Sequence, residues 1–447
     1  MKNFIESFLS VWKIEELKNR ILWTLGLLVV YRFGAHVTLP GIDATQLAGL
    51  EGQTKEGIGS ILDMFTGGSF SKASVFALGI MPYISASIVV QLMGIAIPYL
   101  QKLQKDGESG RKKMNQITRW LTIGITLLQG PGYIYNLYKT VPQSAFLLPS
   151  DSFAFLFSSV LILTTGTIFA MWLGEKITDK GIGNGISLLI MVGILARLPE
   201  AFIQEVTSRL TGANGGLMVI VIEIIFWMLI IIACVLLVMA IRKIPVQYAR
   251  RTTVGDYEQD ITGGNRQWIP LKLNAAGVMP IIFAQAIMFI PAALAGLSES
   301  ETSQSIAGAF SNMFGFWYNL VFALLILIFT FFYTAITVPT NKMADDLKRS
   351  GGFIPGIKPG VETSDFLDRI MSLITFPGAL FLALIAVFPA IVYSLGVQQS
   401  WAMFYGGTSL IIMVGVAIDT IQQINTYLLN KHYDGLMKSG KNRKAVA

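Results

Sequence analysis

The sequence is poor in the residues that carry most redox and acid–base chemistry. It contains one cysteine, Cys234, and two histidines, His36 and His432. One cysteine cannot form an internal disulfide, and no cysteine or histidine pair has the spacing of a metal or redox site. No GxxxxGK[ST] nucleotide-binding motif and no nucleophile–base pattern occur. We therefore expect no enzymatic activity, no cofactor and no metal, and we interpret Cys234 as a small apolar packing residue.

Charge is also scarce, and apolar residues take its place. Only 14% of the 447 residues are charged and 53% are hydrophobic, whereas soluble domains carry about a quarter charged residues. Runs such as 217–241 and 317–338 are long enough to cross a hydrocarbon core of about 30 Å as helices. Lipid offers no partner to a free backbone amide, so a helix is the default there. The composition predicts an all-α polytopic membrane protein.

Hydropathy predicts ten spans, and the basic residues orient them. Of 34 Lys and Arg, 28 lie in alternate connecting segments and the two ends, which the positive-inside rule places in the cytoplasm together with both termini. Residues 425–447 are then a cytosolic tail. The spans are expected at 21–40, 74–98, 118–137, 153–173, 184–205, 217–241, 275–295, 317–338, 370–392 and 403–424.

Residues 1–20 do not have the pattern of a cleavable signal, because three glutamates interrupt them. Apolar residues recur there at helical spacing, which predicts an amphipathic helix on the cytosolic membrane surface. A helix packed on the cytosolic loops is the alternative interpretation.

Residues 58–72 are moderately apolar but too short and too interrupted to span, since Gly67 and Gly68 break them and Asp63 and Lys72 carry charge. Non-helical backbone at membrane depth requires surrounding protein or water. The segment is therefore interpreted as a re-entrant half-helix, with an external loop as the alternative.

Ionisable residues inside the spans are few. Glu223, Asp419 and Arg32 have no evident partner at matching depth, whereas transporters usually pair such groups along a pathway. A secondary transporter or small-solute channel remains the alternative function.

Seven strings along the chain are distinctive. They are 31-YRFGAHVTLPGID-43, 76-FALGIMPYISASIVVQL-92, 107-GESGRKK-113, 172-WLGEKITDKGIGNGISLLI-190, 271-LKLNAAGVMP-280, 342-KMADDLKRSGGFIPGIKPG-360 and 405-YGGTSL-410. In order and spacing they resemble the SecY family, the channel-forming subunits of the bacterial Sec protein translocon.

The resemblance implies two pseudo-symmetric, inverted five-helix halves around a central pore. The first half would be 21–205 and the second 217–424, joined by an external hinge loop, 206–216. The segment 58–72 would be the family's re-entrant plug, held loosely by few contacts. Its candidate residues are Ile61, Leu62, Asp63, Met64, Phe65, Gly67 and Gly68.

By the same resemblance, six isoleucines would form a hydrophobic pore ring that dewets and blocks ions when no chain occupies it. They are Ile80, Ile84, Ile186, Ile190, Ile282 and Ile412. Ser85, Gln129 and Asn274 match the family's polar cluster at a lateral gate, although such residues can also simply satisfy local backbone. Hydrogen bonds of this kind are worth about 0.6 kcal/mol on average.

The cytosolic loops 242–274 and 339–369 are implied to dock partners through Arg250, Arg251, Lys348, Arg349 and Lys358. The implied partners are the SecA motor ATPase, the ribosome, SecE-like and SecG-like small membrane subunits, signal peptides, unfolded secretory chains and membrane lipid. Lys358 stands where the family usually has arginine, and 265-NRQWIP-270 departs from its usual string.

The function implied is passage of unfolded secretory polypeptides across the bacterial cytoplasmic membrane, with lateral release of apolar segments into lipid. A bound motor or ribosome would supply the energy. An insertase or scaffold without a continuous pore is a further alternative, but it would lack the ring and the plug.

Overall fold

The computed structural model describes residue 12 and residues 14–47, 58–146, 153–211, 216–248, 266–295 and 312–444. The chain forms two compact units. The N-terminal unit comprises residues 1–214, 398–401 and 416–447, and the C-terminal unit comprises residues 215–397 and 402–415. The tenth expected span is therefore divided between the units, whereas the sequence assigned all of it to the second half.

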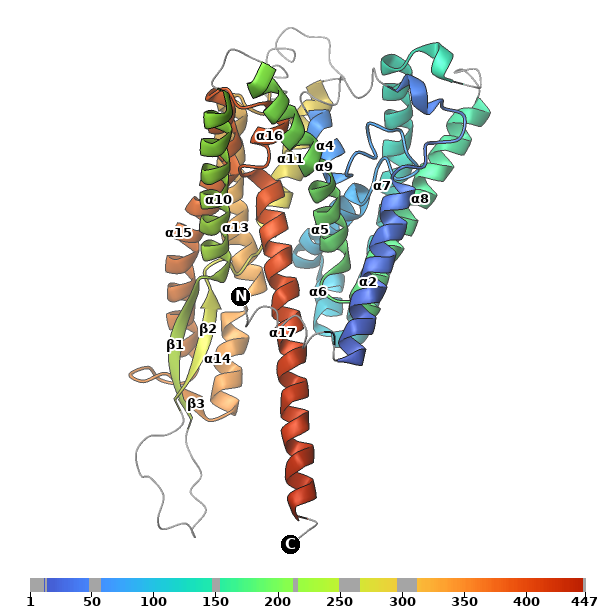
Figure 1. Ribbon diagram of the computed structural model, residues 1–447. Helices are drawn as coiled ribbons and strands as arrows, with labels where there is room; N and C mark the ends of the chain where they lie inside the picture. Colours follow the sequence, from blue (N-terminus) through green and yellow to red (C-terminus); the bar gives the residue numbers. More distant parts are fainter. Residues whose placement is uncertain are drawn as a thin grey trace, which may run out of the picture. The chain divides into compact units, whose positions relative to one another are not determined.

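A helix lies at each of the ten expected spans (Figure 1). In the part of the chain that the structure describes, six helices are long and apolar enough to cross a membrane, and the bent pair α5–α6 makes a possible seventh. The ten helices are α2 (Glu15–Gly34), α5 (Met81–Ala96), α7 (Gly107–Thr140), α8 (Phe153–Lys180), α9 (Gly185–Thr211), α10 (Gly216–Met239), α11 (Met279–Ala295), α13 (Phe316–Thr337), α15 (Val361–Ser394) and α17 (Gly407–Lys444).

Several of these helices run beyond the apolar stretch that predicted them. α9 continues to Thr211, so most of the expected 206–216 loop is helical, and α17 continues through the expected tail to Lys444. α15 begins at Val361 with a polar turn ahead of its apolar run. Hydropathy detects the lipid-crossing part of a helix and not its polar extensions, which explains these differences. The expected amphipathic segment 1–20 lies mostly outside the described residues, and its last residues already belong to α2.

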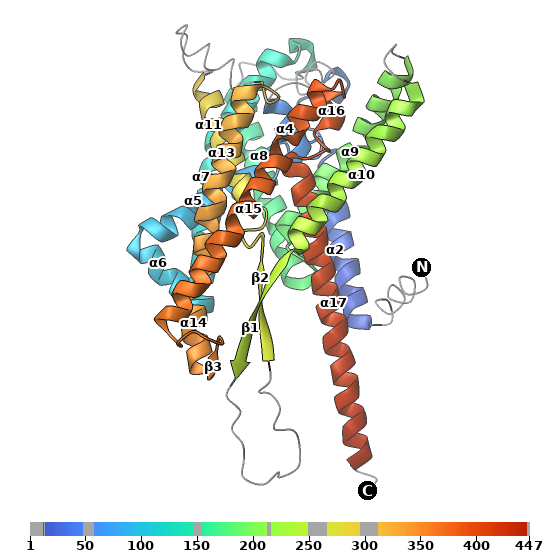
Figure 2. The ribbon, with the colours of Figure 1, turned by 90° about the vertical axis from the view of Figure 1, so that its left-hand side faces the viewer.

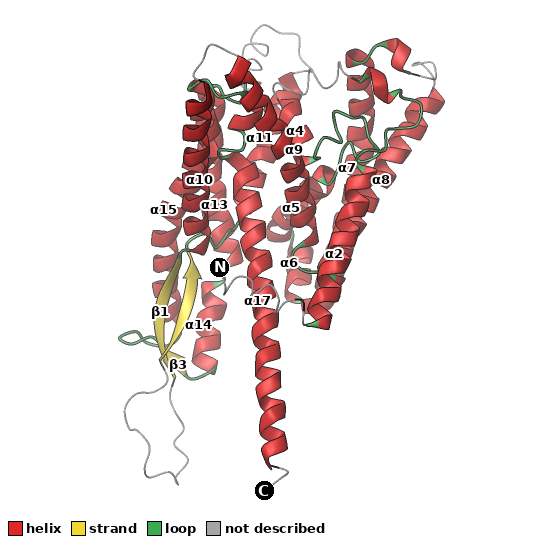
Figure 3. Ribbon diagram, viewed as in Figure 1, coloured by secondary structure: helices red, strands yellow, loops and turns green. Residues whose placement is uncertain are grey.

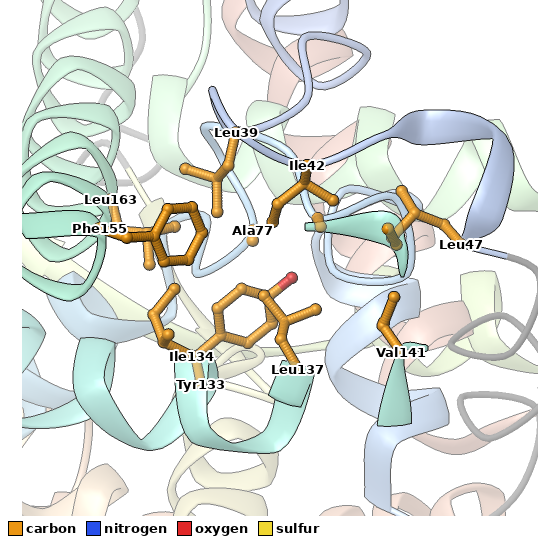
Figure 4. Close-up of a cluster of buried hydrophobic side chains, with 12 residues drawn as sticks. Leu39, Ile42, Leu47, Ala77, Tyr133, Ile134, Leu137, Val141, Phe155 and Leu163 are labelled. Carbon is orange, nitrogen blue, oxygen red and sulfur yellow. The ribbon is translucent and has the colours of Figure 1, made fainter. Parts of the chain in front are cut away.

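The N-terminal unit has an apolar core between α7, α8 and two loop stretches (Figure 4). Leu39 and Ile42 follow α2, Ala77 precedes α5, and Ile134 of α7 and Phe155 of α8 pack against them. The stretches are joined to each other by an isolated antiparallel bridge between Thr38 and Ser74. The unit also contains the short elements η1 (Ala44–Gln46), α4 (Ile58–Phe65), α6 (Pro98–Lys105) and η2 (Gln143–Ala145).

The C-terminal unit packs α13 against α11 and α15, and α10 against α15. α10 buries a narrow stripe that includes Ile230, Cys234 and Leu237, while Leu217, Met218 and other large apolar side chains of this helix are exposed. An exposed apolar face of this extent is what a helix in contact with lipid presents. The remaining elements are α14 (Thr340–Arg349) and α16 (Gln399–Ala402), whose last residue is in this unit.

The connections expected as irregular loops at 242–274 and 339–369 instead contribute a small antiparallel sheet. It consists of β1 (Ile241–Tyr248), β2 (Arg266–Lys272) and β3 (Gly352–Phe353), in the order β2-β1-β3 (Figures 2 and 3). Ile244 and Val246 alternate on its buried face and pack with Leu271 and with Leu347 of α14. The sequence prediction missed these strands, and Trp268 of the departing string 265–270 lies in β2 opposite Pro245.

Candidate functional site

Two helices of the N-terminal unit begin two residues after a glycine with positive φ. Gly79 has φ 54° before α5, and Gly183 has φ 82° before α9. Side-chain-bearing residues rarely adopt this conformation, so glycine allows the chain to turn sharply into each helix. Four of the predicted ring residues lie at these two helix starts: Ile80, Ile84, Ile186 and Ile190.

The C-terminal unit repeats the arrangement. Gly277, with φ 65°, precedes α11, and Gly407, with φ 64°, begins α17. Ile282 lies in the first turn of α11, and Ile412 lies in the second turn of α17. All six predicted ring residues thus lie in the first two turns of four helices, or one residue before, and each helix begins at a left-handed glycine or two residues after one.

The six isoleucines are shielded from solvent to different degrees. Ile80, Ile190 and Ile412 are buried, and the other three are half-buried. Ile84 follows Ile80 by one turn, and its backbone N–H donates to the Ile80 carbonyl at 3.0 Å. The signal for this shared placement is visible in the sequence, where a glycine stands one to five residues before an isoleucine at each helix start. Membership in one ring stays a prediction.

The predicted plug segment, 58–72, begins with the short helix α4 and continues in turns from Thr66, and these turns run on beyond the segment to Ile80. It is not loosely held, contrary to expectation. Asp63, Thr66, Ser69, Ser71 and Ser74 are all buried. Every hydroxyl in this group but that of Ser74 donates to a backbone carbonyl, and Ser74 accepts from the Phe76 N–H at 3.1 Å. Of the other predicted plug residues, Leu62, Met64 and Phe65 belong to α4, and the side chain of Ile61 lies outside the described set.

The turn after α4 contacts α9 where Gly67 meets Gly193. Gly67 and Gly68 have φ of 64° and 89°. A Cβ on Gly67 would lie 2.8 Å from the Gly193 Cα, and a Cβ on Gly193 would lie 2.8 Å from the Phe65 carbonyl oxygen. Neither contact leaves room for a methyl group, so the close approach of this turn to α9 requires glycine on both sides.

Two arginines hold the same turn, and the sequence left one of them, Arg32, without an evident partner. Arg197 of α9 forms an ion pair with the Asp63 carboxylate, and its Nη2 donates to the Ser71 hydroxyl at 2.8 Å. Arg32 of α2 donates from Nη1 to the Gly67 carbonyl at 2.9 Å. The expectation that Arg32 lacks a partner was therefore wrong. An arginine within an apolar span was the available signal, because such a residue is normally paired.

The predicted lateral-gate residues belong to three different segments of the chain. The Ser85 hydroxyl donates to the Met81 carbonyl of its own helix at 3.2 Å, and Gln129 is exposed on α7. Asn274 lies in the turn before α11, where it is buried and its Oδ1 has no hydrogen-bond partner among the described residues. No hydrogen bond between Ser85 and Gln129 occurs in the described structure, so the cluster stays a prediction.

The predicted docking cations project from the strand-bearing connections. Lys348 and Arg349 are exposed in the last turn of α14. Lys358 is exposed in the turn before α15, with its Nζ 3.6 Å from Glu362 Oε1. Arg250 and Arg251 lie outside the described residues.

Comparison with known proteins supports the resemblance. A family model described as SecY matches residues 74–421. The Protein translocase subunit SecY of Streptomyces scabiei is 38% identical over 444 residues, which cover 97% of this chain and 100% of that protein. The Haemophilus influenzae protein of the same name is 40% identical over 428 residues, which cover 95% and 94%.

Solved structures share the fold at low sequence identity. One described as "The structure of a protein conducting channel" has a TM-score of 0.59 at 17% identity, covering 92% of each chain. Sec61 in the canine ribosome-channel complex has a TM-score of 0.52 at 14% identity, covering 92% of each chain.

Proposed function

Because this chain belongs to the SecY family, we propose that it works as the protein-conducting channel of a Sec translocon through the specific elements described above. The chain is a multi-pass membrane protein whose family acts in protein translocation. Our proposal is that unfolded secretory polypeptides pass between the starts of α5, α9, α11 and α17. Apolar segments would leave sideways into lipid.

The observation that carries this proposal is the shared placement of the six isoleucines at four glycine-led helix starts. A narrow ring of apolar side chains dewets when empty and so obstructs ions. Isoleucine suits such a ring because its β-branched side chain is stiff at χ1 and makes no hydrogen bonds. The same side chains can close around an extended polypeptide without binding any one residue strongly.

The segment 58–72 is proposed as the plug that seals the empty channel. Its support is the short helix α4 followed by a buried turn that contacts α9, the helix that also carries Ile186 and Ile190. A structure that shares this fold is described in similar terms, "The plug domain of the SecY protein" stabilising the closed state of its own channel.

A lateral gate is proposed at Ser85, Gln129 and Asn274. The buried Asn274 Oδ1, unpaired among the described residues, supports a role for this side chain beyond local backbone capping, since an unsatisfied buried acceptor costs about 1–3 kcal/mol. The Ser85 hydroxyl is already bonded within α5, so it would have to exchange that bond when the gate rearranges.

We place the protein in the bacterial cytoplasmic membrane with both termini in the cytosol. The exposed cations Lys348, Arg349 and Lys358 would then face cytosolic partners, either the SecA motor or ribosomal RNA phosphates. Sec61 and the yeast Ssh1 complex, two channels of this fold, are described bound to ribosomes. SecE-like and SecG-like small membrane subunits complete the proposed complex.

A secondary transporter is the competing function, and the partly buried Asp63–Arg197 pair is the feature that would favour it. However, both side chains are engaged by the turn that follows α4: Asp63 accepts from the Ser71 N–H, and Arg197 donates to the Ser71 hydroxyl. A pair that fixes a structural turn in this way supports a plug rather than a solute pathway.

Cross-linking tests the channel directly. A photoreactive residue placed at the position of each ring isoleucine should capture a stalled secretory chain, whereas the same residue at Leu128, which is 81% exposed on α7, should not. Capture at Leu128 with none at the ring would overturn the pore assignment.

A further inference from the structure

We propose that the Asp63–Arg197 ion pair is the positioning contact that keeps the turn after α4 seated on α9, and that its strength sets how readily a translocating chain opens the channel. This inference rests on the proposed plug function of residues 58–72. It assigns roles to two residues that the ring and gate predictions do not use.

The contact between the turn and α9 owes much of its strength to polar bonds. Gly67 meets Gly193 without any interposed side chain, so little apolar area is buried at that point. The Arg197 guanidinium lies over Gly68, where an added Cβ would be 3.2 Å from its Cζ. At this glycine contact, the hydrogen bonds and charges around Asp63, together with the Arg32 bond to the Gly67 carbonyl, hold the turn in place.

Asp63 organises the turn as well as pairing with α9. Its Oδ1 accepts from the Ser71 backbone N–H at 2.8 Å, and its other oxygen faces Arg197 Nη2. Arg197 Nη2 also donates to the Ser71 hydroxyl at 2.8 Å. One carboxylate and one guanidinium therefore join α4, the turn and α9, and charge-assisted bonds of this kind are about twice as strong as neutral ones.

Arg197 has a second acidic partner that stays behind when the turn leaves. Its Nη1 donates at 2.8 Å to Glu200 Oε2, on the same helix. Removing one member of a buried pair is costly because it strands the other charge. Here the guanidinium keeps Glu200, and Asp63 can move with the turn toward water, so the contact can break and re-form reversibly.

The part of the segment that can move is bounded on its other side. The Tyr133 hydroxyl of α7 donates to the Phe70 carbonyl at 2.9 Å. Beyond it, the Leu39 N–H donates to the Ala73 carbonyl, and the Val75 N–H donates to the Val37 carbonyl, each at 2.9 Å. Residues from Phe70 onward are thus fixed to the core of the N-terminal unit. Once Asp63 is released, only the Arg32 bond to the Gly67 carbonyl, of the polar contacts described above, still holds the turn before that anchor.

A ligand shifts a two-state equilibrium only by its differential affinity for the two states. If the turn after α4 is bound more tightly to α9, the incoming apolar signal segment must therefore supply more binding energy before the channel opens. Weakening this contact should let poorly apolar signals pass and should let ions leak through the idle channel.

The test uses the full chain, with whatever companion subunits purify with it, in vesicles of phosphatidylethanolamine and phosphatidylglycerol. Asp63→Asn keeps the Ser71 bond and leaves Arg197 with Glu200, and we expect roughly a tenfold rise in ion leak. Arg197→Gln should leak more, because it leaves the Asp63 carboxylate buried without a cation. Glu200→Gln is the matched control, since it alters the same arginine and leaves the pair intact; its leak should stay at the wild-type level.

The double variant Asp63→Asn/Arg197→Gln separates a paired contact from two independent defects. If the two residues act through each other, its leak should be no greater than that of Arg197→Gln alone. If the increase in leak of the double variant is instead the product of the increases of the two single variants, the two residues act independently and the proposed pairing is wrong. Export of precursors whose signal has a shortened apolar core is the second readout: both single variants should raise it, whereas a folding defect would lower export of every precursor.

Deletion of residues 60–70 distinguishes failure of this inference from failure of the plug. If the deletion leaks and both single variants do not, the plug stands and the ion pair does not control it. If the deletion does not leak either, the proposed plug itself is wrong, and with it this inference.

Discussion

Gly193 of α9 lies so close to the turn after α4 that a side chain at this position has no room. A Cβ at this position would lie 2.8 Å from the Phe65 carbonyl oxygen, which is too close for any real contact. Gly124 of α7 is also helical, yet nothing lies within 4 Å of the Cβ it lacks. Substitutions at these two positions therefore distinguish the intrinsic cost of glycine in a helix from the requirement for close approach to a neighbouring segment.

We expect Gly193→Ala to destabilise the protein by about 1–3 kcal/mol, the usual cost of overpacking, and to raise the ion leak by displacing the turn. Gly124→Ala should instead be neutral or stabilising by about 0.5–1 kcal/mol, because alanine favours a helix. Thermal unfolding in detergent and leak in vesicles measure the two effects. Equal behaviour of the two variants would contradict the close packing at Gly193.

Lys358 offers a second residue-scale prediction. Its side chain is 85% exposed and its ion pair with Glu362 spans 3.6 Å, so the pair contributes at most about 1 kcal/mol. Lys358→Glu should leave the unfolding temperature unchanged and reduce SecA-dependent transport by reversing a docking charge. Glu362→Gln, which breaks the pair but keeps the cation, should transport normally. Normal transport by Lys358→Glu would remove this residue from the partner site.

The elements differ in how far the sequence predicts them. The ten apolar stretches follow from hydropathy because lipid requires every such stretch to be helical. The hairpin β1–β2 was missed because its strands are separated by residues 249–265 and each contains a proline. Pro245 is tolerated because β3 pairs only with Gln247 and Tyr248, so Pro245 has a neighbouring strand on one side only.

The sequence also predicts only part of the candidate site. The isoleucines could be assigned by resemblance, and their helices by hydropathy. The contact of Asp63 with Arg197 joins residues 134 positions apart, and no local periodicity reports such a pairing. The glycines of TGGSFS suggested mobility, but in the folded protein they allow a close contact with α9. The same residue type serves both purposes, so composition alone could not decide between them.

At the scale of an element, deletion of residues 60–70 removes all of α4 except its first two residues, both turn glycines and the Phe70 carbonyl that Tyr133 binds. We expect increased ion leak with export retained, because Val75 and Ala73 still bond to the stretch after α2. Conductance across planar bilayers and precursor export measure the two outcomes. An unchanged conductance would argue against a plug, and full loss of export would point to misfolding of the core shown in Figure 4.

For the whole molecule, the distribution of basic residues makes a prediction about sidedness. Trypsin added to inverted membrane vesicles should cleave after Arg349, which lies exposed in the last turn of α14, whereas cells stripped of their outer layers should be protected there. The positive-inside rule places this connection in the cytosol. Cleavage after Arg349 from the outside only would reverse the topology and exclude the proposed contact with cytosolic partners.

The buried position of Cys234 has a practical consequence for every such experiment. Its side chain is 0% exposed within α10, so a water-soluble maleimide should not reach it in the folded protein. Any cysteine introduced elsewhere would then be the only one labelled, without first replacing Cys234 and opening a cavity in the packing of α10. Spin labels on the turn after α4 and on α9 could therefore record the distance between them, before and during translocation, in an otherwise native chain.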